Sequence, residues 1–159
     1  MDIIQTFLLT KKDLLSILNF SDIPINDKSL DFLLTSYLRK ELNIDKSHKI
    51  HALKTHKEYF IDVVFGSKLF ELQKDDRDYK CGDLLLLKCT DELGKLCIRT
   101  KSNANANHYS FLLVKVGYIL KDAENFGLSD GYCIMGIKDF YQINLLLPVD
   151  KDDDDDDLI

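Results

Sequence analysis

The chain has 159 residues, of which 45% are hydrophobic and 30% are charged, a composition typical of one soluble globular domain with its own core. Its apolar runs are shorter than the roughly 18 residues of a membrane-spanning helix, and lysines follow the N-terminal apolar run, the reverse of a secretory signal. The net charge of −6 resides in the six aspartates Asp152–Asp157. We therefore expect a cytoplasmic protein whose residues 149–159 form a disordered acidic tail.

Residues 1–45 predict an N-terminal helical hairpin. Thr10 and Asp13 resemble a capping box for a helix over residues 11–20, and Asn26 or Asp27 caps a second helix. Between residues 30 and 42, leucines and one tyrosine recur with a 3.6-residue period and give this second helix one apolar face. We expect that face to pack on the following domain, with dimerisation as the alternative.

Residues 46–148 predict a small β-rich domain with one embedded helix. Strands are expected over 49–53, 68–72, 84–90, 95–100, 111–120 with a bulge at Gly117, 132–137 and part of 139–148. A helix with an apolar stripe precedes Gly66, a short helical turn spans 122–127, and residues 102–108 read as a polar loop. This order predicts an α+β fold built on a small mixed barrel.

The motifs in this domain resemble a known superfamily. They are His-x-Leu-Lys from His51, Gly-x-Lys-x-Phe-Glu from Gly66, Asp-Arg-Asp from Asp76, and Gly82-Asp83. Together they resemble the ASCH-domain superfamily, and within it a small branch common in bacteriophages and bacterial mobile elements. The superfamily usually carries an arginine two residues after the glutamate, where this chain has Gln73. The resemblance implies a PUA-like β-barrel and an RNA-binding cleft.

The candidate ligand-binding residues lie at the junctions of these elements, where sites tend to be built. They are His51, Lys54, Lys68, Glu71, Asp76 and Arg77. Lys68 and Glu71 are three residues apart, so a carboxylate can steer an ammonium toward a phosphate or carbonyl; a surface ion pair is the alternative. Among the aromatic residues, Tyr59 is expected in the helical core, whereas Tyr79 and Tyr109 are the candidates for stacking on bases.

Three functions remain open from the sequence. Residues 46–121 carry fourteen basic and nine acidic side chains, which favours RNA or a modified nucleotide as the ligand. The resemblance also admits a nucleoside amidohydrolase in which Lys68, with Glu71, is catalytic. The helical residues 1–45 and the acidic tail fit a phage effector that binds a host protein.

The four cysteines are expected to be buried, reduced thiols, because they form no Cys-x-x-Cys pair and lie on or beside predicted strands. Their spacing does not indicate a zinc site. We expect neither a metal nor a cofactor.

Overall fold

The computed structural model describes residues 3–18, 25–98, 100–103 and 106–148. The acidic tail, expected to be disordered, lies outside the described residues. The elements are β1 (Ile3–Thr10), α1 (Lys11–Leu15), α2 (Asp27–Glu41), β2 (Ile50–His56), α3 (Lys57–Val64), β3 (Phe70–Lys74), β4 (Leu84–Thr90), β5 (Thr100–Asn103), β6 (Ala106–Leu120), the 3-10 turn η1 (Glu124–Phe126) and β7 (Tyr132–Pro148).

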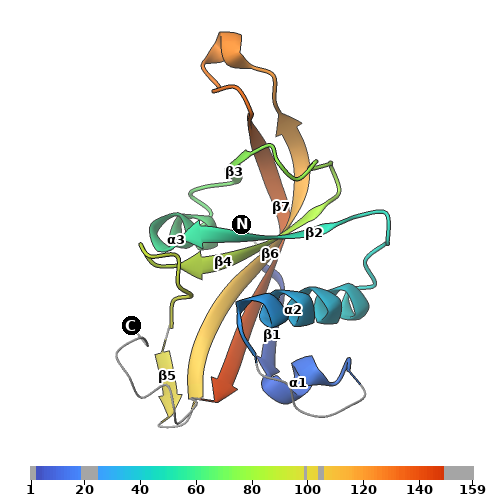
Figure 1. The fold of residues 1–159 in the computed structure, drawn as a ribbon, viewed down its shortest axis with the longest axis vertical. Helices are drawn as coiled ribbons and strands as arrows, with labels where there is room; N and C mark the ends of the chain where they lie inside the picture. Colours follow the sequence, from blue (N-terminus) through green and yellow to red (C-terminus); the bar gives the residue numbers. More distant parts are fainter. Residues whose placement is uncertain (1–2, 19–24, 99, 104–105, 149–159) are drawn as a thin grey trace.

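One seven-stranded mixed sheet dominates the molecule (Figure 1). Its path is β1-β7-β6-β4-β2, with β3 added to β7 and β5 added to β6. The long strands β6 and β7 form an antiparallel hairpin, whereas the β1–β7 and β2–β4 pairs are parallel. This mixed sheet with few helices agrees with the expected α+β class. The path through the described strands ends at β1 and at β2, so the closed PUA-like barrel stays a prediction.

The sheet carries a hydrophobic core on each face. Leu84 and Leu86 point to the face covered by α1 and α2, called here the α2 face, while Leu85 and Leu87 point to the opposite α3 face. Successive side chains of a strand alternate between faces, so a strand buried on both sides reads as a continuous apolar run. This is why the four leucines of β4 stand in sequence at the centre of the molecule.

The N-terminal residues correct one expectation. Where a helical hairpin was predicted, residues 3–10 form β1, which pairs with β7 through residues Phe140–Leu146. The helix after Thr10 has the expected capping box with Asp13 but ends at Leu15, short of the predicted residue 20. A short apolar run without strict alternation cannot be assigned to strand or helix from periodicity, because its partner decides.

Helix α2 confirms the second half of that prediction. Asn26 caps it through a reciprocal pair with Ser29, with N···O distances of 3.0 and 2.8 Å. Its buried residues Leu30, Leu33, Leu34 and Leu38 pack on the sheet in the same core as Phe7, Leu9, Phe111 and Ile143. The predicted domain boundary at residue 45 therefore runs through a shared core.

Three further segments differ from the predictions. Residues 102–108, expected to be a polar loop, contribute to the β5–β6 pair on either side of residues 104–105. Residues 95–100, expected to be a strand, contribute one isolated bridge between Thr90 and Leu96 before β5 begins. Residues 132–148 form one continuous strand. The bulge predicted at Gly117 is confirmed by a register shift between Val116 and Tyr118.

All four cysteines are free thiols, as expected, but only Cys133 is fully buried and Cys81 is exposed. Burial raises the pKa of the Cys133 thiol, and the nearby Asp75 and Asp76 carboxylates raise it further, against the opposing effect of Lys121. Among the helices of the described residues, none combines the length and apolar character that crossing a bilayer requires.

Candidate nucleic-acid interface

Lys68 and Glu71 form the ion pair that their spacing suggested. The Lys68 Nζ atom lies 3.0 Å from Glu71 Oε1, and the Gln73 amide donates to Glu71 Oε2 at 3.4 Å. The exposed fraction of the side chain is 15% for Lys68 and 4% for Glu71. The alternative of a solvated surface pair is therefore wrong, because one carboxylate is buried and both of its oxygens have partners.

Local backbone geometry sets the position of this pair. Helix α3 ends at Val64 and is followed by Gly66, whose φ of 76° lies in the left-handed region that glycine enters without steric cost. The Ser67 and Lys68 amides donate to the Asp62 carbonyl and close the turn, after which β3 begins at Phe70. Glu71 then points to the α3 face, because β3 alternates and Phe70 points outward.

Two aromatic rings flank the Lys68 ammonium. Its Nζ atom lies 5.4 Å from the ring centroid of Tyr59 and 5.2 Å from that of Phe70, within the range of cation–π attraction. Both rings remain exposed, at 55% for Tyr59 and 45% for Phe70. The Lys68 cluster, defined as Tyr59, Lys68, Phe70 and Glu71, thus presents two rings and one cation at the edge of β3.

His51 belongs to a separate, internal cluster. Its Nε2 atom lies 2.9 Å from Asp83 Oδ2 in a buried contact, and its ring meets the Tyr79 ring edge-on with centroids 4.7 Å apart. Asp83 also accepts the amide protons of Lys49 and Lys80, each at 3.1 Å. One carboxylate therefore joins the start of β2 to the loop that precedes β4.

The electrostatics of this cluster favour the charged carboxylate. Burial acts to raise the pKa of Asp83, but the hydrogen bonds from His51, Lys49 and Lys80 together outweigh it and hold that pKa below its usual value. Burial also raises the pKa of Tyr79, with Arg77 opposing and Asp76 adding to the rise. Neither group faces solvent, so this arrangement stabilises the fold and contributes no open ligand site.

The remaining predicted residues do not converge on Lys68. Arg77 donates from its guanidinium to the Ala52 carbonyl of β2 at 2.7 Å, so it fastens the loop to the sheet. Asp76 and Lys54 are exposed, and within the described part of the chain neither makes an ion pair. Of the six candidates, the structure brings together Lys68 with Glu71 and assigns His51 and Arg77 to structural contacts.

The structure reverses the expected burial of two aromatic candidates. Tyr59, expected in the helical core, is exposed beside Lys68, while its neighbour Phe60 is buried. Tyr79, expected to stack on bases, is buried, and Tyr109 lies in β6 rather than in a loop. One residue along a helix corresponds to a rotation of about 100°, so adjacent aromatic residues at the edge of a stripe cannot be told apart by period alone.

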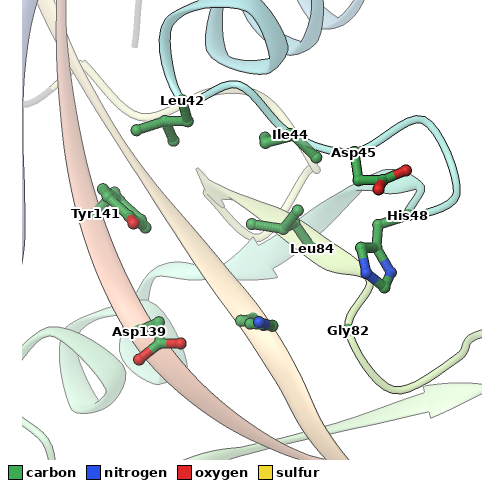
Figure 2. Close-up of a pocket in the computed structure, with 9 residues that line it drawn as sticks. Leu42, Ile44, Asp45, His48, Gly82, Leu84, Asp139 and Tyr141 are labelled. Carbon is green, nitrogen blue, oxygen red and sulfur yellow. The ribbon is translucent and has the colours of Figure 1, made fainter.

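A small pocket lies between the end of α2 and the middle of β6 and β7 (Figure 2). It encloses about 210 Å³, with Leu42, Ile44 and Leu84 on the apolar side. In Figure 2, Asp139 and Tyr141 lie across the cavity from Asp45 and His48. Its remaining lining residues are Gly82 and Lys115.

Gly82 lets the cavity wall form. A side chain here would place its Cβ 2.5 Å from the His48 ring, and the φ of 94° is strained for any other residue. The Ser47 amide donates to Asp45 at 2.8 Å, and hydrogen bonds from Ser47 lower the pKa of the Asp45 carboxyl. In the described ranges, His, Cys, Asp and Glu side chains form no group of three or more that suits a metal ion.

Two comparisons identify relatives of this chain. A 39-residue segment is 49% identical to the "Uncharacterized 12.9 kDa protein in GpA 3'region" of Escherichia phage P2; the match covers 24% of this chain and 36% of the phage protein. The family described as "Domain of unknown function (DUF3850)" matches residues 50–137, which include the Lys68 cluster, the His51–Asp83 contact and most of the sheet. Since this match covers more than half of the chain, the protein belongs to the DUF3850 family.

Proposed function

We propose that this chain binds single-stranded RNA or a modified nucleotide, with the Lys68 cluster as a contact site. One observation carries the proposal: the Lys68 ammonium lies between the exposed rings of Tyr59 and Phe70. Aromatic rings stack on any base, and an ammonium suits the adjacent phosphate. The resemblance to the ASCH superfamily and the basic excess of residues 46–121 support the same ligand class.

Glu71 has a positioning role in this proposal. Its carboxylate is buried and bonded on both oxygens, so it holds Lys68 in one place before any ligand arrives. A cation that is already ordered loses less conformational entropy on binding than a freely rotating lysine. The contacts of His51 and Arg77 lie apart from this cluster and hold the loop between β3 and β4 against β2.

The test is a titration of single-stranded RNA followed by fluorescence anisotropy of a labelled oligonucleotide, at 50 and 200 mM salt. If about three phosphates are contacted, the affinity falls by roughly tenfold or more between these salts. Lys68→Gln should weaken binding, whereas Lys28→Gln, which removes the same charge from an exposed position on α2, should not. Absent binding, or binding that ignores salt and both substitutions, contradicts the proposal.

A further inference from the structure

The α2 face of the sheet is left uncovered toward the η1 end of the β6–β7 hairpin (Figure 1). Two rows of residues cross β3, β7 and β6 in register there. The first row is Phe70–Gly136–Tyr118, and the second is Leu72–Ile134–Leu120. Phe70 is 45% and Tyr118 is 64% exposed, so the first row consists of two exposed rings with a glycine between them.

Gly136 leaves a slot between these rings. Its φ lies outside the left-handed region, so the backbone here does not require glycine. A Cβ added to it would meet only Tyr118, at 3.4 Å from the Cβ atom. Since neighbouring strands are about 4.8 Å apart, Phe70 and Tyr118 are separated by roughly 10 Å of bare backbone. A glycine inside a strand often marks a bulge or a place where a ligand or another backbone approaches closely. Gly136 lies opposite the bulge at Gly117 and leaves the space between the two rings open.

The bulge at Gly117 aims Tyr118 at this face. Val116 pairs with Ile137 and points into the α3-side core, and with regular alternation Tyr118 would follow it there. The register shift between them turns Tyr118 outward instead, opposite Gly136. The methylene groups of Lys138 lie against the Gly117 backbone, within 3.5 Å of the position of an added Cβ.

A pair of lysines occupies the next row on the same face. Lys115 and Lys138 are direct cross-strand neighbours, an arrangement that costs free energy because like charges repel. Neither makes an ion pair with a described residue. They lie about 7 Å along the strands from the slot, since the same face repeats every two residues. Two lysine ammonium groups on one face favour an anion such as a phosphate group.

We infer that the slot over Gly136 holds one base of a single-stranded RNA, stacked between Phe70 and Tyr118, with an adjacent phosphate at Lys115 and Lys138. This inference rests on the proposed function and names a second contact for it. Phe70 belongs to both sites, since its ring also flanks Lys68, so a bound strand runs from the edge of β3 across β7 to β6. The lysine pair favours a polyanion over an apolar protein segment.

The absence of tryptophan from the chain makes a direct test possible. Tyr118→Trp keeps a stacking ring in the slot and introduces one fluorophore. Titration with a single-stranded oligonucleotide should quench its emission by about half or more, because stacking on a base quenches indole. The matched control is Phe126→Trp, at a position 91% exposed in η1, whose emission should change little. Equal responses of the two variants overturn the inference.

Filling the slot provides the second readout. Gly136→Val should weaken RNA binding at least tenfold, while Ile134→Val, on the same strand and face, should bind as the wild type does. Melting curves confirm that both variants are folded, and Tyr118→Leu replaces Gly136→Val if the latter is not. If Gly136→Val or Tyr118→Leu binds RNA with wild-type affinity, the inferred slot is overturned while the proposed RNA binding stands. If the wild-type chain binds no RNA, both the slot and the proposed function are contradicted.

A second copy of the chain is the other candidate occupant of the slot, and it must be excluded. If a second copy of the chain covers these rings, the Tyr118→Trp emission will shift with protein concentration in the absence of RNA, and the mass measured by light scattering will double. Either result overturns the inference. A monomer with concentration-independent emission, quenched only by RNA, is the expected result.

Discussion

Asp83 shows how one buried carboxylate can order three segments of the chain. It binds the His51 imidazole and the amides of Lys49 and Lys80, while its own carbonyl accepts the Val116 amide at 2.8 Å. Removing a partner from such a cluster leaves buried donors without acceptors, which costs more than an exposed bond is worth. The contact therefore matters for stability rather than for ligand binding.

The first prediction concerns acid stability. The pKa of Asp83 is lowered in the folded state, so its contribution is present above the unfolded value of about 3.9 and is lost as the pH falls through the lower folded value. Asp83→Asn should therefore cost about 1–3 kcal/mol at pH 7, with the difference from wild type shrinking below about pH 4. Urea unfolding at pH 7, 5 and 3.5 measures this. Asp62→Asn, at an exposed position, serves as the control, and a pH-independent difference would contradict the assignment.

At the scale of elements, the structures that neighbouring residues determine could be predicted from the sequence, whereas those that a distant partner determines could not. The helix cap at Asn26 (one of two candidate positions), the helix before Gly66 and the bulge at Gly117 depend on neighbouring residues, so the sequence predicts them. The strand β1 depends on residues Phe140–Leu146, which no local pattern near Ile3 reveals. The same limit applies to the site: the spacing of Lys68 and Glu71 indicated their contact, whereas that of His51 and Asp83 spans 32 residues.

The second prediction tests β1 as an integral strand. Leu9 is 2% exposed in the α2-side core, while its neighbour Leu8 is 66% exposed on the other side of the strand. Leu9→Ala should destabilise the protein by about 2–4 kcal/mol, because it leaves a cavity in a packed core. Leu8→Ala is the matched control and should cost less than about 0.5 kcal/mol. Equal effects, measured by chemical denaturation, would mean that β1 is not docked as described.

At the scale of the whole molecule, the N-terminal residues and the domain strands share one core, so we expect them to unfold as one unit. Helix α2 and β1 supply Leu33, Leu34, Leu38 and Leu9 to a core that also contains strand residues. The third prediction is that a chain lacking residues 1–42 loses its cooperative thermal transition, because an apolar sheet face is exposed to water. Circular dichroism and calorimetry measure this. A truncated chain that melts cooperatively near the wild-type temperature would show that residues 46–148 fold alone.

This prediction also changes how a protein partner should be sought. If a truncated chain no longer bound a protein partner, the cause could be unfolding of the whole domain as readily as removal of the docking surface. A single substitution on the exposed side of α2 avoids that ambiguity. Phe32 is exposed there, so Phe32→Ser alters the surface of the helix while Leu33 and Leu34 keep their core contacts. A host protein that binds through this helix should bind the wild-type chain but fail to bind the Phe32→Ser variant.

The parallel pairing of β1 with β7 has a consequence during protein synthesis. β1 is synthesised about 130 residues before its partner Phe140–Leu146. At roughly 5–20 residues per second, the nascent strand waits about 7–26 seconds with an unpaired backbone edge and the apolar side chains of Phe7 and Leu9 in contact with solvent or chaperones. The soluble yield of this protein should therefore respond to translation speed and chaperone supply more than its final stability suggests.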